Sequence, residues 1–189
     1  MSPVLELEAL CLMQGLDRGG REDVDPQLLD TRWAMGFAAG IPDDNPLFYA
    51  TDRDGGVVVH PLFPVAAEWQ LIMAIRGNGT GLSTDEVRRG IHVGHDLILH
   101  QPLDTAGTTG RHVHLTVRTV AVGRHRAGAT QTLEFVGSTA DTPLWRTRMT
   151  SLYLGVELDG EPLASDDPWP DSPHTLDASH VVPLATETS

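Results

Sequence analysis

The chain has 189 residues, of which 40% are hydrophobic and 21% charged, so it suits one globular domain with extensions. Its formal net charge is −13, from 13 basic and 26 acidic residues. This balance argues against a nucleic-acid backbone or an anionic membrane as partner, because both require a positive face. Every residue counted as basic is arginine, so Schiff-base chemistry and lysine nucleophiles are excluded.

The cysteine content and the apolar runs bear on the compartment. Cys11 is the single cysteine, so no disulfide can form within the chain, which fits a reducing compartment. No apolar run reaches the roughly 18 residues that span a bilayer. The first twenty residues lack a basic start, and acids interrupt their apolar stretch, unlike a signal peptide. We therefore expect a cytoplasmic protein that does not contact a membrane.

The first half of the chain predicts two helices separated by a loop. Residues 1–24 read as an N-terminal extension, and a helix is expected from Asp25 to Gly40, with Asp25 as its cap. The acidic loop at residues 40–56 follows it, then an extended run at 57–59. Residues 65–75 are almost all apolar, which predicts a helix buried on most sides.

The second half predicts four strands, because apolar and polar residues alternate in four runs. The runs cover residues 91–103, 110–125, 129–140 and 144–158, and their short connections favour an antiparallel meander. In the last run, Trp145, Thr147 and Met149 should share the face opposite to Arg146 and Arg148. Residues 159–189 are rich in Pro, Asp and Ser and read as a tail. An antiparallel sheet wrapped around a buried apolar helix over residues 25–158 satisfies both halves, an α+β fold.

The chain contains the order "AAGIPDDNPLFY", an acidic turn and "GGVVVHPLFPVAAEW". This order resembles the helix, the "GDxNPL" loop and the start of the central helix of the MaoC-like hydratase and dehydratase family, in its N-terminal half-domain form. The run "IHVGHDLILHQPL" is similar to the strand that follows that helix. The resemblance covers roughly residues 25–157. It implies a single hot-dog fold, in which the sheet wraps around a long central helix.

The family's chemistry is the syn addition or removal of water on an acyl thioester, by an Asp and a His spaced as Asp-x-Asn-Pro-Leu-His. Asp43 matches the Asp and Asn45 the Asn, but Phe48 stands where the His should be. A phenyl ring cannot accept a proton. Non-catalytic half-domains of the family have the same kind of substitution and pair with a second hot-dog unit that carries both residues.

His60 offers a replacement for the missing histidine. Catalytic members often have Ala-His-Gly at the mouth of the helix, and here the matching residues are "VHP". Pro61 has no N–H to polarise the thioester carbonyl, but that of Leu62 could do so from the same helix start. The resemblance thus implies Asp43 and His60 as catalytic residues, and Asn45, Phe48, Tyr49 and Leu62 as substrate-binding residues.

Simpler explanations stand beside these assignments. Asp and Asn next to Pro are common in turns, and His60 could be a partly buried structural residue. Arg146 and Arg148 could meet the phosphates of a coenzyme A or carrier arm, or could lie on a solvated strand face. His92 and His100 share strand parity while His95 has the opposite one, and no cysteine accompanies them, so we expect no metal or other cofactor.

Three functions remain open from the sequence. The first is an (R)-specific hydratase or dehydratase acting on an acyl thioester of coenzyme A or an acyl carrier protein, for example in dehydration or cyclisation of a polyketide. The second is a non-catalytic hot-dog subunit that shapes the acyl tunnel of a catalytic partner. The third is a hot-dog thioesterase or thioester-binding protein. All three imply a homodimer or a heterodimer with another hot-dog protein, because such tunnels form between two units.

Overall fold

The computed structural model describes residues 4–6, 22–23, 27–75, 82–106, 110–140, 142–164 and 169. The predicted helix cap Asp25 and the single cysteine, Cys11, lie outside these ranges. Among the described residues, no helix is long and apolar enough to cross a membrane.

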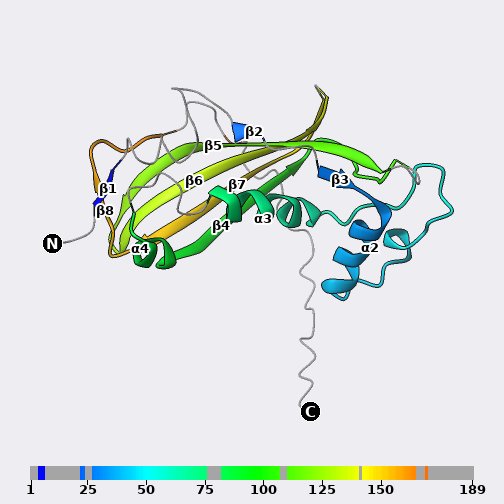
Figure 1. Cartoon of the computed structure of the whole chain (residues 1–189), viewed down its shortest axis with the longest axis horizontal. Coiled ribbons are helices and arrows are strands. Elements are labelled where there is room, and N and C mark those ends of the chain that lie inside the picture. The colour runs from blue at the N-terminus through cyan, green and yellow to red at the C-terminus, as the bar shows by residue number, and fades with distance from the viewer. Residues whose placement is uncertain are drawn as a thin grey trace, which may run out of the picture.

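Four long antiparallel strands form a curled sheet, as predicted (Figure 1). They are β4 (Gly90–Leu99), β5 (Arg111–His125), β6 (Gly128–Thr139) and β7 (Thr142–Leu154). The short strands β2 (Glu22–Asp23) and β3 (Gln27–Leu29) pair with β5 on its other side. A separate parallel pair joins β1 (Val4–Glu6) to β8 (Glu157–Asp159), so the expected N-terminal extension contributes strands.

The predicted meander is correct for β5, β6 and β7 and wrong for β4. The strand order is β2-β5-β6-β7-β4, so β4 pairs with β7 and not with β5. The reason is that the connection after β4 is held away from the hairpin geometry by residues 57–59. Val59 N–H donates to the Leu103 carbonyl at 2.9 Å, and Val58 forms a bridge with Asp104. This segment therefore carries the chain across to the other side of the sheet.

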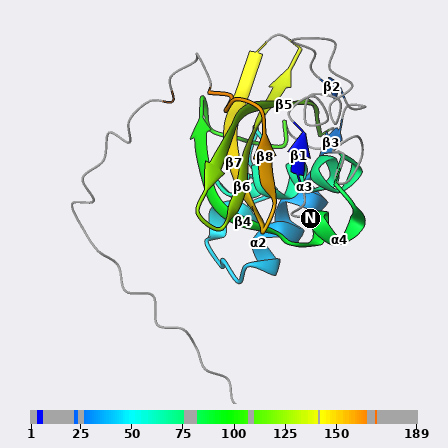
Figure 2. The same ribbon diagram turned by 90° about the vertical axis from the view of Figure 1, so that its left-hand side faces the viewer.

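Helix α3 (Phe63–Ile75) lies along the concave face of the sheet (Figure 2). It confirms the predicted apolar helix and begins two residues before the predicted start. Phe63, Ala67 and Leu71 are fully buried against the sheet. The expectation of burial on most sides is wrong for this single chain, because about half of the Trp69 and Met73 surface is exposed. Apolar surface of α3 thus remains exposed in the single chain.

Helix α2 (Thr31–Gly40) begins later than the sequence predicted. The Asp30 side chain accepts a hydrogen bond from Trp33 N–H at 2.7 Å, so Asp30 is the cap. The preceding residues Gln27–Leu29 are extended because they pair with β5. Long-range pairing therefore overrides the helical spacing of Leu28 and Leu29.

Two short helices complete the domain. The helix η1 (Pro46–Phe48) follows α2, and α4 (Thr84–Arg88) precedes β4. Ser83 caps α4 as predicted, in a reciprocal capping box with Glu86. Figure 1 places α2 at one end of the sheet and α4 at the other, with α3 between them.

The side chain of Trp145 on β7 packs closely against the neighbouring strand β6. Trp145, Thr147 and Met149 are buried on the concave face, while Arg146 and Arg148 lie on the outer face, as the alternation predicted. Gly137 on β6 lies opposite Trp145, and a Cβ atom at Gly137 would come within 2.3 Å of the indole ring. Only a residue without a side chain leaves room for the indole at this point.

We predict that Gly137→Ala destabilises the fold by about 1–3 kcal/mol, because the added methyl group displaces the buried Trp145 ring. Chemical denaturation monitored by circular dichroism measures the change. Gly36→Ala is the matched control, since Gly36 lies exposed within α2 with no atom near the new methyl group, and alanine favours helices. Equal stability of the two variants would contradict the proposed packing.

Candidate functional site

The acidic loop after α2 is a tightly bonded turn that holds Asp43 in place. Asn45 N–H donates to Asp43 Oδ1 at 3.0 Å, and Leu47 N–H donates to Asn45 Oδ1 at 3.1 Å. The Tyr49 hydroxyl donates to the Asp43 carbonyl at 2.7 Å. Asn45 and Tyr49, which we expected to bind substrate, thus act here as supports of the turn. The turn chemistry suggested by the sequence is present, and it orients the Asp43 carboxylate.

The structure brings Asp43 and His60 together. Asp43 Oδ2 lies 3.2 Å from His60 Nε2, although the two residues come from different sides of the loop. The His60 side chain is 11% exposed and that of Asp43 is 35% exposed. Of the two, therefore, the carboxylate is the group that solvent or a ligand can reach.

A backbone contact determines which nitrogen of His60 carries its hydrogen. Leu62 N–H donates to His60 Nδ1 at 3.1 Å. Because an amide N–H can only donate, Nδ1 must be the unprotonated nitrogen and Nε2 must carry the hydrogen. The Nε2–H group therefore points at the Asp43 carboxylate, an arrangement in which the imidazole orients the acid.

The same contact bears on the expected role of Leu62. Its N–H is already used by His60, and the next N–H, that of Phe63, donates to the His60 carbonyl at 2.9 Å. The residue after Phe63 is a proline, which has no N–H. Leu62 therefore does not present its N–H to a thioester carbonyl in this structure.

Two aromatic rings enclose the other sides of His60. The ring centroid of Phe48 lies 5.0 Å from that of His60, and the ring centroid of Phe37 lies 5.7 Å away. Phe48 is 7% exposed, so it forms a packed wall beside the histidine. Phe48 thus holds His60 in place from one side.

Comparison with known proteins shows what this fold is similar to. No family model and no curated protein matches the sequence. Solved structures do match: a MaoC-like dehydratase from Phytophthora capsici superposes with a TM-score of 0.61 and 14% identity, covering 79% of this chain and 51% of that one. HtdX of Mycobacterium tuberculosis superposes with a TM-score of 0.54 and 18% identity, covering 71% of this chain and 51% of that one.

A third match is the C-terminally truncated HadBC complex of M. tuberculosis, a (3R)-hydroxyacyl-ACP dehydratase, with a TM-score of 0.50 and 13% identity. It covers 70% of this chain and 92% of the HadBC chain. The chain has the hot-dog fold. It spans about half the length of HtdX and of the P. capsici dehydratase.

A second polar cluster, which the sequence analysis missed, lies inside the hot-dog core. Glu68 on α3 is fully buried, and its Oε1 atom accepts hydrogen bonds from Trp145 Nε1 at 2.9 Å and from Thr147 Oγ1 at 2.7 Å. Its Oε2 atom lies 3.6 Å from His95 Nε2 on β4. The sequence feature that could have indicated this cluster is a single acid, Glu68, within an apolar helix, together with the Trp-x-Thr pattern of a predicted strand.

Burial favours the uncharged forms of both Glu68 and His95. Burial raises the pKa of Glu68 to about 7, against the hydrogen bonds from Thr147 and Trp145, which lower it. Burial, and then His92, lower the pKa of His95. Although 3.6 Å would suit an ion pair, both directions favour the uncharged forms, so this is a carboxylic acid beside a neutral imidazole. Within the described residues, Glu68 Oε2 and both nitrogens of His95 make no hydrogen bond.

A β-bulge corrects the predicted parity of these histidines. The pairing of β4 with β7 shifts between His92 and Gly94, so His92 lies opposite Ser151 while His95 lies opposite Met149. The extra residue in the bulge places the side chains of both histidines on the same face of the sheet. Their ring centroids are 5.3 Å apart. In the described part of the chain, no three potential metal ligands come together.

The outer face of the sheet carries an arginine cluster centred on buried Glu134. Arg118, Arg146 and Arg148 all donate to its carboxylate. Burial raises the pKa of Glu134, but the bonds from the three arginines outweigh that effect and leave it lowered. The guanidinium groups of Arg146 and Arg148 lie 5.1 and 4.8 Å from the Trp169 ring centroid. These two arginines are therefore structural partners of Glu134 and are stacked by a tail residue.

We predict that Glu68→Gln makes the protein more stable than wild type at pH 8 by about 3 kcal/mol, and that the gain disappears near pH 4.5. Folding raises the Glu68 pKa from 4.5 to about 7, so ionising this carboxyl group costs stability as pH rises through that window. The glutamine side chain stays neutral and keeps an acceptor for Trp145 and Thr147.

Urea denaturation of both proteins at pH 5 and pH 8 measures the difference. Glu157→Gln on β8 is the control, because this glutamate is exposed and its substitution removes no buried acid. A Glu68→Gln protein that is less stable than wild type at pH 8 would show that Glu68 is a stabilising anion.

Proposed function

We propose that this protein is a hydratase or dehydratase of acyl thioesters in which Asp43 transfers the proton and His60 positions it. The observation that carries the proposal is the 3.2 Å contact between His60 Nε2 and Asp43 Oδ2 within an Asp-x-Asn-Pro-Leu turn. The hot-dog fold, and its likeness to a MaoC-like dehydratase and to HadBC, support the same reaction class.

One carboxylate is sufficient for a syn reaction. In dehydration, Asp43 takes the proton from the α-carbon of a 3-hydroxyacyl thioester, and the electron pair of that C–H bond forms the double bond. The C–O bond at the β-carbon breaks, and the same carboxyl group delivers the proton to the departing hydroxyl as water. His60 Nε2–H steadies the carboxylate throughout. Hydration is the reverse sequence.

The fold and the site chemistry suit a particular kind of acyl chain and carrier. We propose an (R)-3-hydroxyacyl or 2-enoyl chain carried by coenzyme A or an acyl carrier protein, as in dehydration or cyclisation of a polyketide. Phe48 lies beside His60, and Leu62 is exposed at the same end of α3, where both can line the path of the acyl group.

A second hot-dog unit completes this proposal. An exposed apolar stripe runs along α3 and consists of Leu62, just before the helix, with Trp69 and Met73, each about half exposed. The edge strand β4 exposes further apolar surface at Ile91 and Val93. Surfaces of this kind mark protein interfaces. The HadBC match is itself a complex of two chains. We therefore propose a homodimer or a heterodimer whose other chain donates a hydrogen bond to the thioester carbonyl.

We predict that Asp43→Asn lowers kcat for hydration of a 2-enoyl thioester at least about 100-fold, because the amide keeps the turn but cannot transfer the proton. His60→Ala should lower kcat by a smaller factor, with KM nearly unchanged, because it removes only the group that orients the acid. Absorbance of the enoyl thioester follows turnover, and circular dichroism checks the fold.

His114→Ala is the matched control, since His114 is exposed on β5 away from the loop, and its kcat should equal that of wild type. Full turnover by Asp43→Asn would remove Asp43 from the mechanism. Release of a free thiol by the wild-type protein, in place of hydration, would identify a thioesterase.

The second candidate is a non-catalytic subunit that shapes the acyl tunnel of a partner. Two observations favour it: Phe48 replaces the family's histidine, and the Leu62 N–H is used by His60. Under this alternative, purified protein has no hydratase activity, and adding a hot-dog partner with an intact Asp and His restores turnover. In that mixture Asp43→Asn would leave kcat unchanged, which separates the two candidates.

A further inference from the structure

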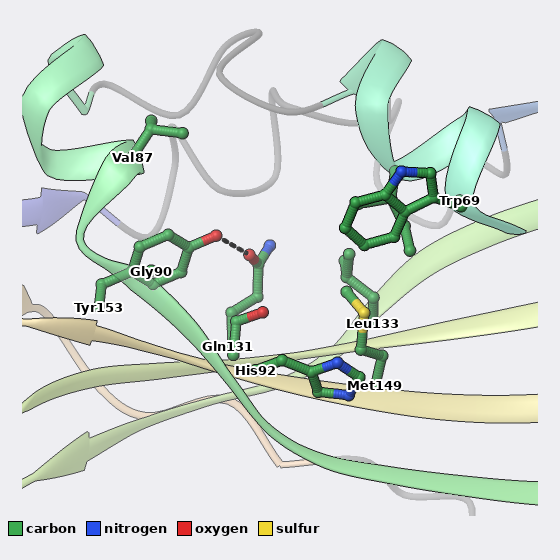
Figure 3. Close-up of a pocket in the computed structure, with 10 residues that line it drawn as sticks. Trp69, Val87, Gly90, His92, Gln131, Leu133, Met149 and Tyr153 are labelled. Carbon is green, nitrogen blue, oxygen red and sulfur yellow. Dashed lines mark hydrogen bonds between the residues drawn. The ribbon is translucent and has the colours of Figure 1, made fainter. Parts of the chain in front are cut away.

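A cavity of about 230 Å³ lies between the C-terminal half of α3, helix α4 and strands β4, β6 and β7. Figure 3 shows Trp69, Leu133 and Met149 grouped at one end, and Tyr153 and Gln131 below Val87 at the other. His92 lies between the two groups (Figure 3). The cavity is thus apolar at one end and polar along part of its wall, the usual composition of a small-molecule site.

The hydrogen position on His92 follows from the backbone carbonyl of Gly94. His92 Nε2 lies 2.9 Å from the Gly94 carbonyl oxygen. A carbonyl oxygen can only accept, so Nε2 carries the hydrogen and Nδ1 has the lone pair. The β-bulge after His92 brings this carbonyl within reach of the ring. His92 therefore presents a fixed hydrogen-bond acceptor beside the cavity.

Ser151 on β7 is the direct cross-strand partner of His92 and also lines the cavity. Opposite residues on neighbouring strands have Cβ atoms about 5 Å apart, so one polar atom of a ligand can reach both. In the described part of the chain, the Ser151 hydroxyl has no hydrogen-bond partner. The pair thus offers one acceptor, His92 Nδ1, and one donor, Ser151 O–H.

This pattern matches a polar group that both donates and accepts, and a hydroxyl group is the smallest such group. An alcohol can donate to His92 and accept from Ser151, whereas an ether or ketone can only accept. Among the described residues that line the cavity, none is an acid or an arginine. His95 lies beside His92 on the same face, and burial lowers its pKa, which disfavours a positive charge that could hold an anion there.

We propose that this cavity is a second binding site, for a neutral aliphatic or aromatic alcohol whose hydroxyl group binds His92 and Ser151. The apolar part of the ligand packs against Trp69, Leu133 and Met149. The site is separate from Asp43 and His60, and it does not depend on the proposed reaction.

The test is titration of the full chain with 1-hexanol, followed by NMR of the Trp69 indole N–H and the His92 imidazole. The matched ligands are 1-methoxypentane, which cannot donate, and hexanoate, which is anionic. Hexanol should bind about tenfold more tightly than either, because each lacks one required hydrogen bond. Equal affinity for the three ligands, or no shift with hexanol, would overturn the proposal.

Two variants locate the binding on the protein. Ser151→Ala should weaken the binding of hexanol and of 1-methoxypentane about tenfold each, because both oxygens accept from the Ser151 hydroxyl, and Ser151→Leu should abolish both by filling the cavity. Thr150→Ala, the neighbouring residue on the other face of β7, is the control and should bind hexanol as wild type does. Hexanol binding that survives Ser151→Leu would place the ligand elsewhere. The titration requires no turnover, so loss of the proposed hydratase activity would leave its outcome intact.

Discussion

The burial of one carboxyl group, that of Glu68, constrains how the central helix sits in the sheet. A carboxyl group without partners inside an apolar core costs several kcal/mol, so α3 can pack only where Trp145 and Thr147 reach Glu68 Oε1. This fixes both the rotation of the helix and its position along β7. Gly137 makes the arrangement possible by leaving room for the indole ring. With α3 held in this way, His60 lies before one end of the helix, and Trp69 borders the cavity towards the other.

The loop that precedes the helix brings Asp43 and His60 together. The Phe48 ring packs against His60, which makes the contact with Asp43 from the other side of the loop. The Leu62 N–H fixes the imidazole with its Nε2–H towards the acid. In our proposal the proton-carrying role therefore falls to the partly exposed carboxylate, and the enclosed histidine orients it. The same contact uses the N–H that would otherwise polarise a thioester, which is why a second subunit enters the proposal.

Local patterns in the sequence predicted those features that depend on neighbouring residues. The alternation from Trp145 to Met149 gave the correct faces of β7, and the run at 65–75 gave the apolar helix. Long-range pairing decided the rest: Gln27–Leu29 joined β5 in place of starting a helix, and the segment around Leu103 carried β4 across to β7. The bulge after His92 could not be read from parity, because one extra residue reverses the face of everything beyond it. Asp43 and His60 could be nominated from the motif, but only their geometry shows which nitrogen faces the acid.

The most direct test of this account is the hydrogen position on His60. Two-bond proton–nitrogen NMR correlations of the imidazole distinguish the tautomers, and an Asp43→Asn variant assigns the contact. We predict that His60 is the Nε2–H tautomer, with Nδ1 accepting from Leu62, and that the Nε2 signal shifts in the variant. A ring with its hydrogen on Nδ1, or one whose Nε2 signal is indifferent to Asp43→Asn, would contradict the view that His60 serves this carboxylate.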